Sequence, residues 1–362
     1  MPNRPKEEWP PVQMVKTVES LAEAITEWES ADAIGIDTES NSFFAYKDRL
    51  CLVQISANDT DWIVDPIALG EDLKAINPLL ADSGLVKIFH AAEYDLMLLK
   101  DELGVETKGI FDTQVAMTLL KHQKTGLAAL LESHYGIKVS KKHQRSDWGK
   151  RPLSDSQLEY ARTDTRFLPD VRAKLMDQLE EANMTSACDG ECRRLEQEIL
   201  PPREPNMEGW RKMKQARGMT GESKARLRAL FQWRERTAQE RDVPVFRVLA
   251  NDALGELARK PARSMKDLAD RKGVGWKVAK RHGDGILAAL KEAQGQVVEE
   301  NPVEKLDRAE RQKRRLYREN REALKNWRKK QASALELPSV SPEGPEADSN
   351  AKWSRDDPRV VN

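Results

Sequence analysis

The spacing of apolar and polar residues predicts a first region in which strands alternate with helices. Short apolar runs predict strands at 33–36, 49–56, 62–64, 86–89 and 109–111. Helical periodicity predicts helices at 17–29, 73–80, 93–102, 113–120, 127–135 and 156–182. Strands that come first and then alternate with helices are typical of an α/β domain, so we expect a mixed central sheet with flanking helices.

The second half of the chain has only helical periodicity. A Pro- and charge-rich stretch at 190–221 precedes it, and residues 222–292 predict a compact all-α bundle. We therefore predict six parts: an N-terminal arm (1–14), an α/β domain (15–185), a connecting segment (186–220), a helical domain (221–298), a basic C-terminal helix (299–335) and a disordered tail (336–362).

Composition narrows the class of protein. The sequence has no run of about 18 apolar residues and no apolar signal at its N-terminus, so we expect a cytoplasmic protein without membrane attachment. Cys51, Cys188 and Cys192 do not have the spacing of a disulfide framework or of a four-ligand zinc site, and the five histidines show no metal-ligand spacing. A metal would therefore have to be bound by oxygen.

Charge is distributed unevenly although the net charge is zero. Residues 1–200 contain 23 Lys and Arg against 35 Asp and Glu, a net charge of −12, whereas the remaining residues carry +12. An acidic half followed by a basic half favours metal chemistry combined with capture of a polyanion. Two solvated surfaces of opposite sign would explain the same counts, and the charge alone does not separate the two interpretations.

Three acidic motifs lie at the ends of predicted elements. Asp37 and Glu39 end an apolar run, Asp95 lies where a strand gives way to a helix, and Asp164 follows Tyr160 by one helical turn. Four carboxylates are costly to bring together unless a cation neutralises them, so we predict an oxygen-ligand site for two divalent cations, Mg²⁺ or Mn²⁺. Each motif alone is more often a helix cap or a surface pair, and their joint occurrence carries the prediction.

Such a pair of ions can support in-line displacement at a phosphate, with one ion activating water and the other stabilising the departing 3′ oxygen. Tyr160 is a poor general base, because the reference pKa of tyrosine is about 10. We expect its hydroxyl to orient the attacking water.

These motifs resemble the three exonuclease motifs of the DEDD superfamily in its Tyr-containing branch, and further blocks resemble ribonuclease D: 49–55, 111–114 and 146–153. The resemblance spans roughly residues 12–180 and implies a ribonuclease H-like fold. It also implies that Asp37, Glu39 and Asp164 hold one metal, that Asp37 bridges to a second, and that Asp95 binds the second directly or through water.

Residues 226–293 are similar to an HRDC domain, the helical module that follows ribonuclease D and some helicases. The Gly-x-Gly at 273–275 could expose backbone N–H groups to a phosphate, and Lys277, Lys280 and Arg281 would add charge, although a simple tight turn explains the glycines equally well. Residues 300–335 are too short for the second such module that ribonuclease D typically has.

Other candidate contacts with nucleic acid lie nearer the acidic motifs. Arg145, Trp148 and Lys150 are candidate contacts in a predicted loop, and we interpret His90 as a strand-end residue that shapes the site. The basic helix has aromatic residues among its cations, which suits RNA, but a solvated helix with Glu–Arg pairs is an equal alternative.

We therefore predict a metal-dependent 3′→5′ exoribonuclease that releases nucleoside 5′-monophosphates and needs no small-molecule cofactor. By the resemblance its substrates are 3′ ends of structured RNA such as tRNA precursors. The alternatives are a DNA exonuclease of the same branch and a non-catalytic nucleic-acid-binding scaffold.

Overall fold

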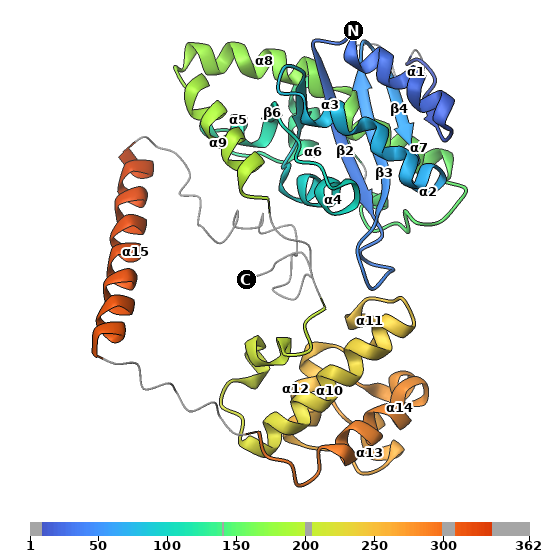
Figure 1. Ribbon diagram of the computed structural model, residues 1–362, viewed down its shortest axis with the longest axis vertical. Coiled ribbons are helices and arrows are strands. Elements are labelled where there is room, and N and C mark those ends of the chain that lie inside the picture. The colour runs from blue at the N-terminus through green and yellow to red at the C-terminus, as the bar shows by residue number, and fades with distance from the viewer. Residues whose placement is uncertain (1–8, 140, 200–204, 299–307, 335–362) are drawn as a thin grey trace.

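The computed structural model of the 362-residue chain describes residues 9–139, 141–199, 205–298 and 308–334 (Figure 1). Its first part contains one six-stranded sheet, with the spatial order β1 (Gln13–Val15), β4 (Thr60–Val64), β3 (Leu50–Ala57), β2 (Ala33–Ser40), β5 (Val86–Phe89) and β6 (Ile110–Asp112). The pairs β2–β3 and β3–β4 are antiparallel, and the other neighbours are parallel. The predicted mixed α/β sheet is confirmed.

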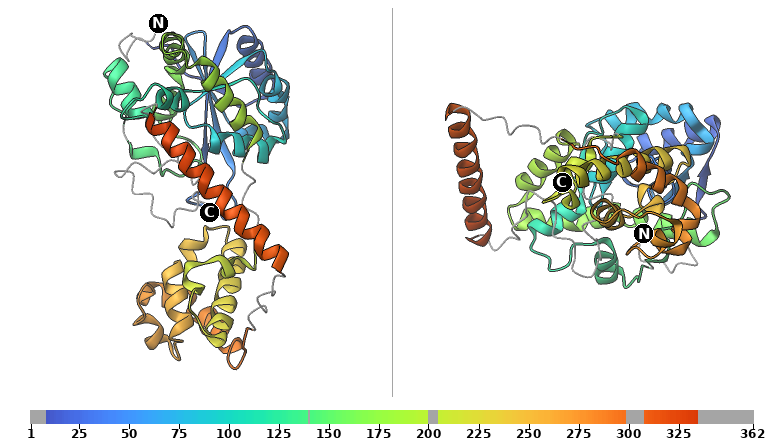
Figure 2. Two further views of the ribbon diagram at one scale, coloured as in Figure 1. Left: turned by 90° about the vertical axis from the view of Figure 1, so that its left-hand side faces the viewer. Right: turned by 90° about the horizontal axis from the view of Figure 1, so that it is seen from below.

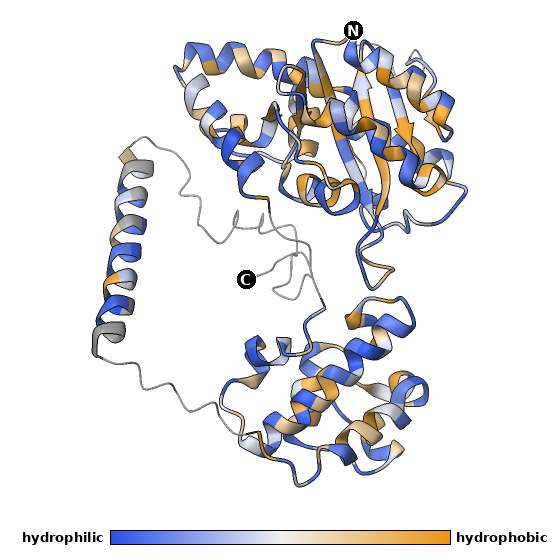
Figure 3. Ribbon diagram, viewed as in Figure 1, coloured by the Kyte–Doolittle hydropathy of each residue, from blue (hydrophilic) through white to orange (hydrophobic). Residues whose placement is uncertain are grey.

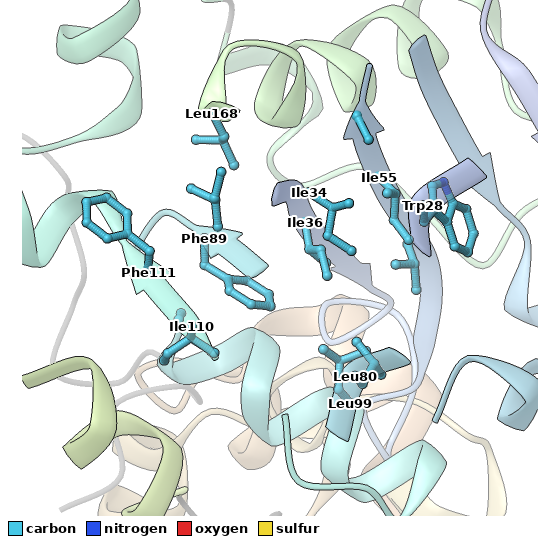
Figure 4. Packing of buried hydrophobic residues seen from close by; sticks show 14 of the residues in the cluster. Trp28, Ile34, Ile36, Ile55, Leu80, Phe89, Leu99, Ile110, Phe111 and Leu168 are labelled. Atoms are coloured by element: carbon cyan, nitrogen blue, oxygen red, sulfur yellow. The ribbon is translucent and has the colours of Figure 1, made fainter. Parts of the chain in front are cut away.

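Helices cover this sheet, and the central strand β3 is buried along its whole length. The helical segments are α1 (Val18–Glu29), α2 (Pro66–Leu69), η2 (Gly70–Ile76), α3 (Asn77–Ala81), α4 (Glu93–Leu103), α5 (Thr113–Leu119), α6 (Leu127–Tyr135), η3 (Lys141–His143), α7 (Asp155–Arg166), α8 (Leu168–Glu181) and α9 (Thr185–Gln197). Figure 4 shows Ile34, Ile36 and Ile55 of the sheet packed among side chains from the helices and from β5 and β6.

The prediction of one helix over 156–182 was wrong, because the helix breaks at Phe167. Pro169 has no N–H to donate and its ring would clash with the carbonyl group of Thr165, so α7 ends and α8 begins with proline at its second position. The predicted helix over 73–80 is likewise divided into η2 and α3, with Pro78 in the first turn of α3.

The second part is all-α, as predicted, and has its own core. It comprises η4 (Gly209–Lys212), η5 (Lys214–Ala216), α10 (Gly221–Glu240), α11 (Val245–Val248), α12 (Asn251–Arg259), α13 (Met265–Ala269) and α14 (Gly275–Glu292). The basic helix α15 (Arg308–Ala334) is drawn apart from both cores (Figure 2), and its surface is largely hydrophilic (Figure 3).

The domain limits drawn from the sequence do not coincide with the element ends. Residue 15 lies inside β1, and the limit at 185 falls at the start of α9, whose Cys188, Cys192 and Leu195 pack in the first core. Trp210 and Met219, within the predicted connecting segment, pack in the second core. Most of the predicted N-terminal arm and all of the predicted tail lie outside the described residues.

Within the described part of the chain, no helix combines the length and the apolar character that crossing a membrane would require.

Candidate active site

Three carboxylates converge between β2 and α7. Asp37 and Glu39 are two residues apart on β2 and therefore project from the same face of the sheet, towards Asp164 on α7. One ligand oxygen from each residue lies within 4.8 Å of the others. The sequence-predicted grouping of these three carboxylates is therefore present as a compact acidic cluster.

A glycine on β2 lets α7 approach this closely. A Cβ atom added to Gly35 would lie 2.9 Å from the carbonyl oxygen of Thr165 and 3.0 Å from the Cβ of Leu168. Gly35 lies on the same face as Asp37, two residues before it. Any larger residue would push the α7–α8 corner away from the sheet and separate Asp164 from its partners.

Buried ion pairs hold α7 in register against the sheet. Arg162 donates from Nη2 to Asp61 Oδ2 at 2.6 Å, and Arg166 donates from Nη1 to the same oxygen at 2.7 Å. Ser56 donates to the other Asp61 oxygen at 2.7 Å, and its hydroxyl also lies 2.7 Å from that of Thr165. Because these groups are almost fully buried, their pairing fixes the position of α7 against the sheet, and with it the position of Asp164.

Asp95 reaches the cluster at an open edge of β2. The pairing with β5 ends at Gly35, so the following part of β2 has no strand beside it on that edge. There Asp95 Oδ1 accepts hydrogen bonds from the Thr38 N–H at 3.1 Å and from the Thr38 hydroxyl at 2.5 Å. Thr38, between the two acidic residues of its motif, therefore ties the fourth carboxylate to the strand that carries them.

The turn that leads to Asp95 is itself fixed by Asp112. Ala91 has a positive φ of 63°, which is uncommon for a residue with a side chain. Its N–H donates to Asp112 Oδ1 at 3.2 Å, and that of Ala92 donates to Oδ2 at 2.8 Å. Since Asp112 also caps the N-terminus of α5, one buried carboxylate positions the starts of two helices.

Burial and mutual repulsion raise the pKa values of carboxylates in the cluster. Burial raises the pKa of Asp95 to about 7 and that of Asp164 to about 8, with nearby carboxylates adding to each shift. Burial, followed by the charges of Asp95, Asp164 and Glu39, raises the pKa of Asp37 well above its usual range. A site that gathers carboxylate oxygens in this way fits a hard divalent cation.

Tyr160 lies one turn before Asp164, and its hydroxyl donates a hydrogen bond to the Asp164 carboxylate. Burial, and then the charges of the cluster, raise the pKa of the Tyr160 hydroxyl. It therefore stays protonated at neutral pH and acts as a donor, which agrees with the predicted orienting role. The rings of His143 and Trp148 pack at centroid distances of 5.8 and 6.0 Å from the Tyr160 ring.

The prediction that Trp148 contacts nucleic acid directly is corrected. Its side chain is only 1% exposed and packs with Cys51, Leu52 and Ala161, so no ring face remains for a base. The neighbouring Arg145 and Lys150 are exposed, and the Arg145 guanidinium lies 5.7 Å from the centre of the Phe43 ring. Both cations are accessible to a phosphate.

His90 lies at the end of β5, as predicted, and is half-buried. Thr113 donates its hydroxyl proton to the Phe89 carbonyl group at 3.0 Å, so the His90 Nδ1, 2.9 Å from the same hydroxyl, acts as the donor to it. Burial lowers the pKa of His90 to about 4. A neutral ring offers no charge to a phosphate, which favours the interpretation of His90 as a residue that shapes the site.

Lys277, Lys280 and Arg281 are exposed along the first turns of α14. Gly273 and Gly275 have φ values of 82° and 68°, which allows the sharp turn into this helix. Trp276, which lies between Gly275 and Lys277 in the chain, is 64% exposed. The sequence-based interpretation did not single out Trp276, because an isolated tryptophan in a helix is usually a core residue.

Comparisons with known proteins agree with the fold. Residues 12–180 match the family model described as 3'-5' exonuclease, and residues 223–290 match the HRDC domain model. Ribonuclease D of Cronobacter turicensis is 32% identical over 285 residues, which cover 78% of this chain and 76% of that protein. Ribonuclease D of Escherichia coli K12 is 30% identical, with 78% and 75% covered.

Solved structures give the same result. The crystal structure of Escherichia coli RNase D has a TM-score of 0.66 at 26% identity and covers 91% of this chain and 87% of that chain. The catalytic core of RRP6 from Trypanosoma brucei has a TM-score of 0.70 at 26% identity, with 81% and 82% covered. Together with the acidic cluster and the helical domain, these likenesses show that the chain belongs to the ribonuclease D family of 3′→5′ exoribonucleases.

Proposed function

We propose that this exoribonuclease trims single-stranded 3′ ends of structured RNA, tRNA precursors among them, in the cytoplasm. We further propose that two divalent cations, Mg²⁺ or Mn²⁺, serve the reaction. The convergence of Asp37, Glu39 and Asp164, with ligand oxygens within 4.8 Å of one another, carries the proposal. The Escherichia coli relative, described as an exoribonuclease involved in structured RNA processing, supports the substrate class.

Each acidic residue would have a defined task. Asp37, Glu39 and Asp164 would hold one cation, Asp37 would bridge to the second, and Asp95 would bind the second through the carboxylate that Thr38 orients. When bound, such a pair supplies the positive charge that activates a water and stabilises the departing 3′ oxygen. Tyr160, held by Asp164, would orient the attacking water through its hydroxyl group.

Cations outside the acidic cluster would attract the RNA. Arg145 and Lys150 are exposed in the loop whose Trp148 packs against Tyr160, and Lys277, Lys280 and Arg281 are exposed on the helical domain. The helix α15 adds eleven Lys and Arg against three Glu over residues 308–334. Such contacts bind the phosphate backbone without regard to sequence, so the substrate would be chosen by its shape and by an accessible 3′ end.

The substrate proposal is tested by competition. A tRNA with a short 3′ tail, an unstructured RNA and a DNA of the tail sequence, each labelled at its 3′ end, are mixed with the purified protein and MgCl₂. We expect the tailed tRNA and the linear RNA to release labelled mononucleotide faster than the DNA, and EDTA to stop all release. Faster release from DNA would contradict the RNA assignment, and degradation of the tRNA body would contradict the trimming role.

A further inference from the structure

The loop between β2 and β3, residues 41–49, extends towards the helical domain near α11 (Figure 1). The Tyr46 N–H donates to Asp242 Oδ1 at 3.1 Å, and the Tyr46 hydroxyl donates to Glu235 Oε2 at 3.0 Å. Arg49 also pairs with Asp242 at 3.6 Å. Because Glu235 is only 2% exposed, the Tyr46 hydroxyl supplies a hydrogen bond from one domain to a buried acceptor in the other.

Aromatic contacts extend this interface. The rings of Phe43 and Phe246 meet edge to face at a centroid distance of 6.5 Å, and the Arg247 guanidinium lies 4.4 Å from the centre of the Phe44 ring. All these partners come from the C-terminal end of α10, from the turn that follows it and from α11, so one loop docks on one corner of the helical domain.

The loop also contacts residues that adjoin the acidic cluster in the chain. It begins immediately after Glu39 and Ser40, where the pairing of β2 with β3 is irregular. Tyr94 donates its hydroxyl proton to Asp48 in the loop at 3.1 Å, so the Ser40 hydroxyl, 2.9 Å away, donates to Tyr94. Tyr94 immediately precedes Asp95 on α4. The loop is therefore linked to β2 and to α4, the two elements besides α7 that carry carboxylates of the site.

We propose that this loop couples the helical domain to the metal site. Docking of α10 and α11 on residues 41–49 holds Glu39 and Asp95 at the spacing that divalent cations require, and Tyr46 is a positioning residue for that site. The inference rests on the proposed metal-dependent function. It assigns the helical domain a second task beside RNA capture, since the state of the interface sets how tightly the site holds its ions.

A domain that only captures RNA behaves differently from a domain that also positions ligands. For a capture surface, a weakened interface changes binding of long RNA and leaves unchanged both ion binding and the turnover of an RNA too short to reach α11. For a coupled domain, ion binding changes even with no RNA present. Mn²⁺ binding without substrate therefore separates the two cases.

The experiment compares full-length Tyr46→Phe and Arg247→Ala with wild type. Tyr46→Phe removes the hydroxyl group that donates a hydrogen bond to Glu235, and Arg247→Ala removes the guanidinium group that lies over the Phe44 ring. We expect calorimetry to show Mn²⁺ binding weakened roughly fivefold or more in each, with slower mononucleotide release from an RNA trinucleotide. Loss of a positive charge would by itself strengthen cation binding, so weaker binding by Arg247→Ala cannot be a simple charge effect.

The matched control is Arg228→Ala. Arg228 lies on the same helix α10, but its guanidinium donates to Gln296 at 3.0 Å within the helical domain. We expect wild-type Mn²⁺ affinity and trinucleotide turnover for this variant. Wild-type values for folded Tyr46→Phe and Arg247→Ala, with weakened binding of long RNA only, would overturn the coupling. A wild-type protein that neither binds Mn²⁺ nor releases nucleotides would overturn the proposed function first, and the coupling with it.

Discussion

Tyr160 offers a direct test of a single side chain. Its hydroxyl donates to Asp164 and keeps its proton because burial and the surrounding carboxylates raise its pKa. We predict that Tyr160→Phe lowers kcat by roughly a hundredfold, the lower end of what a positioned proton donor contributes, while the Kd for RNA stays close to wild type. Single-turnover kinetics together with equilibrium binding would measure both. Weaker RNA binding with an unchanged kcat would assign Tyr160 to substrate binding.

The acidic cluster also predicts how pH acts on the metal-bound protein. Without metal, the pKa values of about 7 for Asp95 and about 8 for Asp164 lie above those of an unfolded chain, so folding binds protons, and the associated stability is lost as the pH rises towards 8. Metal binding requires the ionised carboxylates. The increase in Tm on adding MgCl₂ should therefore be small near about pH 6 and larger near about pH 9. An increase that does not depend on pH would argue that the ion binds elsewhere.

Sequence spacing identified the carboxylates of the cluster better than the residues that hold them in place. Asp37 and Glu39 follow a two-residue strand period, and Tyr160 and Asp164 follow a helical turn, so local geometry predicts which faces they share. Thr38 and Asp112 act through partners 57 and 20 or more residues away, and no local pattern reveals such contacts. The burial of Trp148 is a tertiary property of the same kind.

At the scale of elements, the position of α7 depends on Asp61. Two buried guanidinium groups, those of Arg162 and Arg166, share one oxygen of this carboxylate. We predict that Asp61→Asn, which removes the charge that both guanidinium groups share and leaves only Asp59 beside Arg166 and Glu159 beside Arg162, costs on the order of 3 kcal/mol of folding free energy and lowers activity by moving Asp164. Chemical denaturation measures the first effect and a nuclease assay the second.

A surface pair provides the comparison for that variant. Glu71 accepts from Lys74 at 2.6 Å, but both side chains are largely exposed. Glu71→Gln should leave stability and activity near wild type, because exposed ion pairs contribute little. Equal losses from the two substitutions would show that the Asp61 network does not have the special role assigned to it.

Most elements could be predicted from periodicity, and two of the exceptions share a cause. The predicted strand at 86–89 and helix at 127–135 coincide with β5 and α6, because apolar period and element length agree there. The predicted helices over 156–182 and 73–80 both ignored an internal proline, at 169 and at 78. In the helical domain, periodicity predicted helix throughout but not the turns that divide it into five α-helices, α10 to α14, since those turns follow from packing.

At the scale of the whole molecule, the two domains would, in the proposed function, contribute opposite charges to one reaction. The exposed Lys277, Lys280 and Arg281 would offer sequence-independent contacts to RNA at a distance from the acidic cluster in the chain. Replacing all three by alanine should weaken RNA binding and reduce the slope of log affinity against log salt by roughly two units, with trinucleotide turnover unchanged. Filter binding over a salt series measures the slope. An unchanged slope would place the RNA contacts elsewhere.

The central claim is that the converging carboxylates form the metal-dependent exonuclease site. Its most direct test measures mononucleotide release from 3′-labelled RNA against MgCl₂ concentration, for wild type and for folded Asp37→Asn, since Asp37 belongs to the cluster and would bridge both ions. We expect Mg²⁺-dependent release of 5′-monophosphates by wild type and a loss of at least about a thousandfold in Asp37→Asn. Release that persists in EDTA, or an Asp37→Asn variant that keeps the wild-type rate, would contradict it.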